Sequence, residues 1–187
     1  MRIIAAFLLL TILGACAPVI DATSKGPIRQ NPSTRTVGAV IDDDNIETVT
    51  KVNINKISPA MRKAHVDVVS YNGVVLLVGQ VPNEDLRARA AEVASNVKRV
   101  RQVQNALTVE PNIRAGARMY DSWLTTKVKT KLAFNNQIRS GRIKVVTENG
   151  VVYLMGLVRQ AEADRAALVA QRTGGAQRII KAFEYID

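Results

Sequence analysis

Apolar and polar residues along this chain follow a pattern that occurs twice. The segment NGVVLLVGQV at 72–81 returns as NGVVYLMGLV at 149–158. An alternating run rich in β-branched residues precedes each copy, at 66–71 and at 143–148, and such alternation is typical of a β-strand. Two strands around Asn-Gly predict a β-hairpin, because a two-residue turn needs positive φ at both central positions. The turn and strand-end residues of this pattern are Asn72, Gly73, Gly79, Asn149, Gly150 and Gly156.

Segments with a helical spacing of apolar residues flank each hairpin. Asn83 is a candidate N-cap, and the acidic residues after it suit a first helical turn. Gly174 and Gly175 are expected to end the corresponding helix of the second copy. The expected order is helix 46–57, hairpin, helix 84–97 and strand 103–109, then helix 123–134, hairpin, helix 162–173 and strand 179–186. The pattern predicts an α+β fold of two units, each α-β-β-α-β with a three-stranded mixed sheet covered by two helices.

The first 15 residues have the pattern of an export signal peptide. Arg2 is followed by a short apolar run and then by the small residues Gly14 and Ala15. The apolar run is shorter than the roughly 20 residues with which a helix spans a bilayer. Residues 13–16 resemble the lipobox of bacterial lipoproteins, which implies cleavage before Cys16 and acylation of its thiol. The alternative is an ordinary signal peptide followed by a free cysteine, since Cys16 is the only cysteine of the chain.

The composition after the signal divides the chain into a tether and two units. Residues 16–42 are expected to hold the lipidated cysteine and a flexible tether, because Pro, Gly, Ser and Thr interrupt any apolar period there. The two units are expected at 43–111 and 120–187, with a linker at 112–119. The acidic run 42–44 lacks the spaced ligands of a calcium loop, and is expected to precede and cap the first helix.

The repeated unit resembles the BON domain. The resemblance rests on the order of its elements, on the Asn-Gly hairpin and on the Gly-x-Val that ends each second strand, at 79–81 and at 156–158. With the lipobox and the tether, the chain resembles the dual-BON lipoproteins of Gram-negative outer membranes. This resemblance implies a lipid-anchored protein that faces the periplasm, binds anionic phospholipid and supports outer-membrane integrity without catalysis. Ala17 after the cysteine, in place of Asp, favours the outer membrane over the inner one.

Basic residues are concentrated in the second unit of a chain with a formal net charge of +10. Residues 118–187 hold twelve basic and six acidic side chains, against nine and eight in residues 43–110. A cationic unit favours a polyanionic partner, either nucleic acid or anionic lipid head groups. Export argues against nucleic acid, which leaves phosphatidylglycerol or cardiolipin. The alternative is that the charge only keeps the unit soluble.

The predicted helix 123–134 carries candidate lipid-binding residues. Leu124 and Val128 belong to one stripe, which is expected to pack on the sheet. A neighbouring stripe combines Trp123, Lys127 and Phe134, and aromatic rings beside cations are typical of helices that lie on a membrane surface. The candidate lipid-binding group is Trp123, Leu124, Lys127, Val128, Lys131 and Phe134. Alternatively, Trp123 and Phe134 are core residues or pack between the two units.

The chain offers no constellation of residues expected of an enzyme. Its single histidine, His65, precedes a predicted strand and is expected at the surface, so we predict no metal site and no cofactor. The leading hypothesis is a non-catalytic lipid-binding module at the outer membrane. The alternative is a scaffold that binds envelope proteins, such as outer-membrane assembly or division components, through exposed strand edges or through the nearly neutral first unit.

Overall fold

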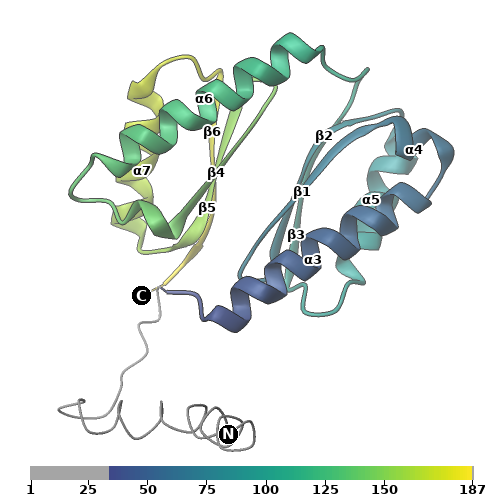
Figure 1. Ribbon diagram of the computed structural model, residues 1–187, viewed down its shortest axis with the longest axis horizontal. Coiled ribbons are helices and arrows are strands. Elements are labelled where there is room, and N and C mark those ends of the chain that lie inside the picture. Colours follow the sequence, from purple (N-terminus) through teal and green to yellow (C-terminus); the bar gives the residue numbers. More distant parts are fainter. Residues whose placement is uncertain (1–33, 187) are drawn as a thin grey trace, which may run out of the picture. The chain divides into compact units, whose positions relative to one another are not determined.

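Helices and strands follow one another in the same order in the two halves of the chain (Figure 1). The computed structural model describes residues 34–186. The first half contains α3 (Val37–Lys56), α4 (Pro59–Lys63), β1 (His65–Tyr71), β2 (Val74–Val81), α5 (Glu84–Ser95) and β3 (Gln102–Val109). The second contains α6 (Ala115–Ala133), the 3-10 turn η1 (Ser140–Arg142), β4 (Ile143–Glu148), β5 (Val151–Val158), α7 (Gln160–Thr173) and β6 (Arg178–Tyr185). The predicted α+β fold of two α-β-β-α-β units is confirmed.

Each half forms a three-stranded mixed sheet with its second strand in the centre. β2 pairs antiparallel with β1 and parallel with β3, and β5 pairs in the same way with β4 and β6. Asn72 and Gly73 form the first hairpin turn with φ of 54° and 75°, and Asn149 and Gly150 form the second with φ of 47° and 72°. Both turns therefore have the positive φ that a two-residue hairpin requires.

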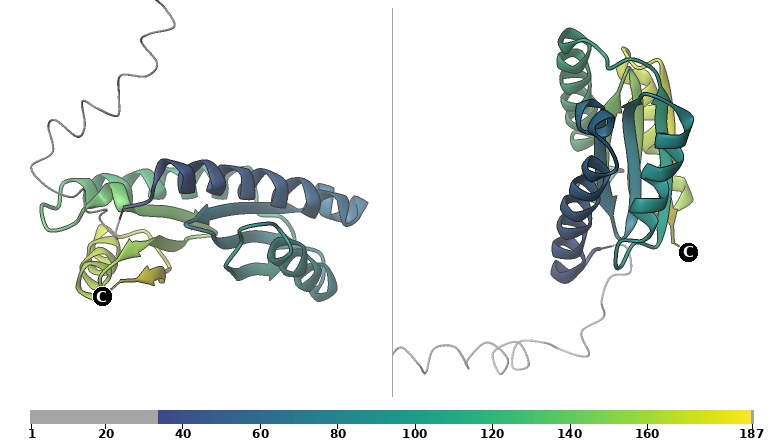
Figure 2. Two further views of the ribbon diagram at one scale, coloured as in Figure 1. Left: turned by 90° about the horizontal axis from the view of Figure 1, so that it is seen from below. Right: turned by 90° about the vertical axis from the view of Figure 1, so that its right-hand side faces the viewer.

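The central strand of each sheet is buried on both of its faces. On β2, Val75, Leu77 and Val81 pack in a core with α3 and α5. The alternate residues of β2, such as Leu76 and Val78, pack in another cluster, which both sheets share. The shared cluster consists of Tyr71, Val74, Leu76, Val78, Tyr153, Met155, Leu157 and Ala182. The two sheets therefore lie face to face, with the helices on the outer sides (Figures 1 and 2).

Polar side chains also join the two halves of the chain. Arg101 and Glu184 form a double contact, with nitrogen to oxygen distances of 2.5 and 3.0 Å. The Lys144 ammonium donates to Glu47 Oε1 at 2.7 Å, and Gln80 Nε2 donates to the buried Glu148 at 2.7 Å. These contacts and the shared cluster lie within the compact unit Pro32–Asp187. This 32–187 fragment contains the three apolar clusters found among the described residues, so it is the fragment proposed for the experiments below.

Two helices begin earlier than expected. α3 begins at Val37, where Thr36 accepts a hydrogen bond from the amide of Ala39, so the predicted tether 16–42 extends too far into the helix. α6 begins at Ala115, inside the predicted linker 112–119, and its N-cap Arg114 makes no side-chain cap. The first turns of both helices hold few buried apolar residues, which is why periodicity placed their starts too late.

The prediction that the acidic run 42–44 precedes and caps the first helix is wrong, because the run lies inside α3. Asp43 is buried and faces the first hairpin. Its carboxylate accepts hydrogen bonds from the amides of Asn72 and Gly73 at 2.8 and 2.9 Å, and from the Ser70 hydroxyl at 2.7 Å. Arg35 donates to the same carboxylate at 2.6 Å. The carboxylate therefore satisfies two backbone amides of the turn that have no hydrogen-bond partner within the hairpin.

Asp121 has the same role in the second half. Its carboxylate accepts hydrogen bonds from the amides of Asn149 and Gly150, both at 2.8 Å. A buried aspartate near the start of the opening helix is therefore part of the repeated unit. The residue is visible in the sequence, but its role depends on where the helix crosses the hairpin.

We expect Asp43→Asn to lower the free energy of unfolding of the 32–187 fragment by about 2 kcal/mol at pH 7, because a side-chain amide cannot accept all these bonds as an anion does. Burial raises the pKa of Asp43, but the amide of Gly73 and the other donors outweigh it and hold the pKa below its ordinary value of 3.8. The stabilising contribution is therefore present above pH 4 and is lost as the pH falls through the lowered pKa. Urea unfolding from pH 7 to pH 3 measures it.

The matched control is Asp44→Asn, since Asp44 is exposed on the same helix. Its free energy of unfolding should stay within about 0.5 kcal/mol of the wild-type value. An Asp43→Asn variant as stable as the Asp44→Asn variant at pH 7 would contradict the assigned role of the carboxylate.

Candidate functional site

One stripe of α6 fixes this helix on the second sheet. Leu124 and Val128 have no exposed surface, and Leu132 is also buried. They pack with β4, β5 and the alanines of α7 in one cluster. The sequence pattern placed these residues on the sheet, which is where they lie. Leu124 and Val128 were also included among the candidate lipid-binding residues, and that assignment is wrong because the core encloses them.

The neighbouring stripe of α6 faces outward and carries large apolar side chains. Trp123 is 51% exposed and Phe134 is 83% exposed. Met119 and Tyr120 continue this stripe toward the start of the helix, one turn before Trp123, and are also exposed. We call Met119, Tyr120, Trp123 and Phe134 the aromatic patch. The alternative that Trp123 and Phe134 are core residues is therefore wrong.

The indole of Trp123 is held between a ring and a cation. The ring of Tyr120 lies 5.4 Å from it between centroids, and the Lys127 ammonium lies 4.7 Å from its centroid. Both distances are within the range of favourable aromatic and cation–π contacts. The patch therefore presents a half-exposed indole with a positive charge beside it. Lys131 is exposed one turn further along α6, and Lys129 is exposed as well.

The loop after α7 supports this arrangement. The Tyr120 hydroxyl donates to the carbonyl of Gly175 at 3.0 Å, and Lys127 donates to the carbonyl of Gly174 at 3.4 Å. Gly175 has φ of 100°, and a Cβ atom there would lie 2.7 Å from the Tyr120 hydroxyl. The Gly-Gly pair was predicted only to end a helix. Its contact with Tyr120 depends on the packing of α6 beside α7, which the sequence pattern does not show.

His65 lies at a different kind of position from the one expected. It begins β1, but its ring is only 20% exposed and its Nε2 atom lies 3.5 Å from Glu148 Oε2 of the other half. The prediction of an ordinary surface histidine is therefore wrong. The close approach follows from the stacking of the two sheets, and no feature near His65 in the sequence indicates it.

Comparison with known proteins identifies the repeated unit. The BON domain model matches residues 42–111 and 120–187. The chain belongs to the BON-domain family. The dual-BON chain is 41% identical over 153 residues to outer membrane lipoprotein DolP of Haemophilus influenzae, with coverage of 82% of the chain and 79% of the relative.

Two further relatives carry other names. The 21 kDa hemolysin of Actinobacillus pleuropneumoniae is 36% identical over 153 residues, with coverage of 82% of the chain and 79% of the relative. The osmotically-inducible protein Y of Escherichia coli is 30% identical over 146 residues, with coverage of 76% of the chain and 72% of the relative. None of these three names describes an enzyme. That the dual-BON chain lacks catalysis stays a prediction.

The similarity to DolP supports the predicted location of the dual-BON chain, lipid-anchored at the outer membrane, and a role in the cell envelope. Cys16, the predicted site of acylation, lies outside the described residues. Within residues 34–186, no helix combines the length and apolar character needed to cross a bilayer.

Gly175→Ala should displace Tyr120 and loosen the indole of Trp123, because a methyl group at this position meets the hydroxyl of Tyr120 and strains a positive φ. We expect the free energy of unfolding of the 32–187 fragment to fall by about 1 kcal/mol or more. The emission of Trp123, the only tryptophan, should change in the folded state. Urea unfolding followed by tryptophan fluorescence measures both.

Gly141→Ala is the matched control, because a Cβ atom there meets nothing within 4 Å. Its stability and emission should be those of the wild type. Identical spectra and stabilities for the two variants would contradict the support of Tyr120 by Gly175.

Proposed function

We propose that α6 of the second BON domain binds anionic phospholipid at the membrane surface, and that the dual-BON protein supports outer-membrane integrity through this contact. The observation that carries the proposal is the exposed aromatic patch with Lys127 on its edge. Helices that lie on a membrane surface typically place aromatic rings at the boundary of water and acyl chains, and basic side chains near the anionic head groups.

The distribution of charge supports the same face. The second domain carries more of the excess of basic residues than the first, and Lys127 and Lys131 lie one turn apart on the side of α6 that carries the aromatic patch. Each lysine near an anionic surface contributes on the order of 1 kcal/mol. Several such contacts, together with aromatic rings that enter the membrane interface, give a binding that is weak but specific for anionic membranes.

Acylation of Cys16 would complement this weak contact. An anchor in the same membrane raises the concentration of α6 near the lipid surface, so that each encounter no longer depends on diffusion from solution. In this proposal the dual-BON protein has two attachments: the acyl chains at Cys16, and the helix that carries Trp123 and Lys127. Phosphatidylglycerol and cardiolipin are the proposed lipids.

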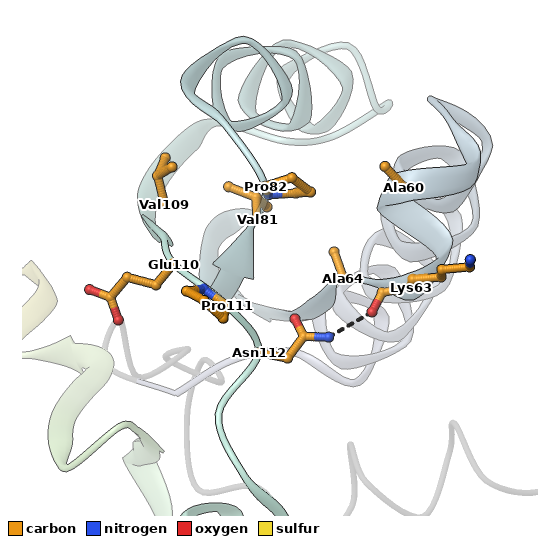
Figure 3. Close-up of a pocket in the computed structure, with 9 residues that line it drawn as sticks. All are labelled: Ala60, Lys63, Ala64, Val81, Pro82, Val109, Glu110, Pro111 and Asn112. Atoms are coloured by element: carbon orange, nitrogen blue, oxygen red, sulfur yellow. Dashed lines mark hydrogen bonds between the residues drawn. The ribbon is translucent and has the colours of Figure 1, made fainter.

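A second candidate function is the binding of an envelope protein by the first domain. A hollow of 480 Å³ lies beside the ends of β2 and β3 (Figure 3). Val81, Pro82, Val109 and Pro111 give it an apolar lining, and Asn112 closes one side by donating to the carbonyl of Lys63 at 2.7 Å. The nearly neutral charge of this domain suits a protein partner better than a lipid surface.

Flotation of the 32–187 fragment with vesicles tests the lipid proposal. We expect the wild type to float with vesicles that contain phosphatidylglycerol, and not with vesicles of phosphatidylcholine alone. Trp123→Ala with Lys127→Glu should lower the partition coefficient roughly 30-fold or more, because reversing one charge alone changes the binding by about 2 kcal/mol. Circular dichroism of the free fragment confirms that the variant is folded.

Val52→Ala with Lys56→Glu on α3 is the matched control, since it makes the same charge change beside an exposed apolar residue of the first domain. This control should float as the wild type does. Equal flotation of the α6 variant and the wild type would overturn the proposal. Lipid-independent capture of one purified envelope protein by the first domain would favour the second candidate function.

Salt should separate the contributions of the lysine and the indole. Raising NaCl from about 0.1 M to about 1 M shortens the screening length from about 10 Å to about 3 Å, so the partition coefficient of the wild type should fall several-fold. Trp123→Ala should bind more weakly with an unchanged salt dependence. Lys127→Gln should show a shallower dependence in the same flotation assay. A salt-independent wild type would contradict an electrostatic contribution.

A further inference from the structure

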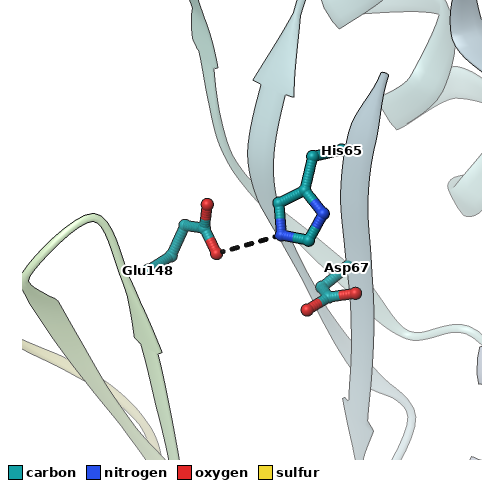
Figure 4. Close-up of side chains that lie close together, drawn as sticks. All are labelled: His65, Asp67 and Glu148. Carbon is teal, nitrogen blue, oxygen red and sulfur yellow. Dashed lines mark ion pairs between the residues drawn. The ribbon is translucent and has the colours of Figure 1, made fainter. Parts of the chain in front are cut away.

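Three side chains with metal-binding groups meet where the two sheets face each other (Figure 4). His65 and Asp67 lie on the same side of β1, two residues apart, and Glu148 ends β4 of the other domain. One ligand atom from each lies within 4.8 Å of the other two. His65 Nε2 and Glu148 Oε2 are 3.5 Å apart, which is longer than a hydrogen bond.

The spacing of the histidine and the glutamate suits a tetrahedral ion. Zinc binds nitrogen and carboxylate oxygen at about 2.0 to 2.2 Å, and tetrahedral geometry then places two ligand atoms roughly 3.4 Å apart. The observed 3.5 Å therefore leaves room for the ion between these atoms with almost no movement of either. Asp67 must approach by a rotation of its side chain, which its exposure of 56% permits.

A second layer of contacts already orients the glutamate. Gln80 Nε2 donates to Glu148 Oε1 at 2.7 Å, which directs Oε2 toward His65. The amide oxygen of Gln80 accepts from the backbone amide of Ile113 at 3.2 Å, so the side-chain amide is itself fixed. Metal ligands are characteristically held by such outer partners. Glu148 is buried, and this burial raises its pKa despite the contact with Gln80, so an adjacent cation would offset the cost of the buried charge.

The side chains around the cluster are mainly acidic, although the chain as a whole is basic, and acidic surroundings favour a bound cation. The cleft of 360 Å³ between His65 and Glu148 is lined by three carboxylates, those of Asp67, Asp121 and Glu148, and by one cation, Arg118. The Lys51 ammonium lies 3.7 Å from the Asp67 carboxylate, and the two side chains are 40% and 56% exposed. A pair of that kind contributes little, so its loss costs little when Asp67 turns toward an ion.

We propose that His65, Asp67 and Glu148 bind one divalent transition-metal ion, Zn²⁺ above all, between the two BON domains. One imidazole nitrogen and two carboxylate oxygens form a ligand set that suits Zn²⁺. Mg²⁺ prefers six oxygen ligands and gains little from the nitrogen. Because β1 supplies two ligands and β4 the third, the bound ion ties the first sheet to the second. Binding to the folded state alone then stabilises the pair of domains.

Titration of the untagged 32–187 fragment with Zn²⁺ tests the site, because His65 is the only histidine of the chain. We expect one ion per fragment by calorimetry, a shift of the single set of imidazole nitrogen resonances, and a higher midpoint of thermal unfolding. The same concentration of Mg²⁺ should produce none of these changes. Asp67→Asn and His65→Ala should each weaken the affinity at least tenfold.

Asp67→Asn is the informative variant. Because Asp67 is exposed, this substitution removes a charged ligand without disturbing the core. Asp85→Asn on α5 is the matched control, because Asp85 is also exposed and lies outside the cluster. Wild-type affinity in Asp67→Asn, equal losses in both aspartate variants, or Zn²⁺ binding without a shift of the His65 resonances would each overturn the proposal. Absence of Zn²⁺ binding to the folded wild type would overturn it as well.

Discussion

The two central strands determine how the rest of the described structure is assembled. Residues 74–78 of β2 and 152–155 of β5 are buried on both faces of their sheets. An apolar face that remains in water is unfavourable by about 25 cal/mol per Å² relative to a buried one, so each sheet needs a cover on both sides. Helices of the same domain cover one side, and the sheet of the other domain covers the second. The two domains therefore depend on each other for their inner faces.

Polar contacts between the two domains accompany this shared apolar face. Glu184 accepts two hydrogen bonds from Arg101 and one from Asn72 at 2.9 Å, which joins the hairpin turn of the first domain to the last strand of the second. Burial raises the pKa of Glu184, but the contacts with Arg101 and Asn72 outweigh it and lower the pKa. We expect the shared apolar cluster to supply most of the attraction between the sheets, and these directional contacts to favour one alignment of them.

The repeated pattern predicted the strands, the hairpin turns and the central apolar stripe of α6 because each depends on residues close together in the sequence. The buried roles of Asp43 and Asp121 were missed because they depend on a helix that crosses a hairpin 27 to 30 residues away. The face-to-face packing of the sheets was not predicted, although the near-continuous apolar runs of β2 and β5 are typical of strands buried on both sides. His65 and Glu148 are 83 residues apart in the sequence, and no local signal connects them.

The same assembly explains why the aromatic patch is available to a partner. Leu124 and Val128 hold α6 on its own sheet, and the inner face of that sheet is already covered by the first domain. The indole of Trp123 therefore has no remaining apolar surface within its own fold, and Tyr120, Lys127 and the Gly174–Gly175 loop support it from the sides without enclosing it. A ring that is held in place yet half exposed loses little conformational entropy on binding. The packing of α6 on the sheet and its contacts with the loop after α7 thus favour a surface contact made by this helix as a preformed unit.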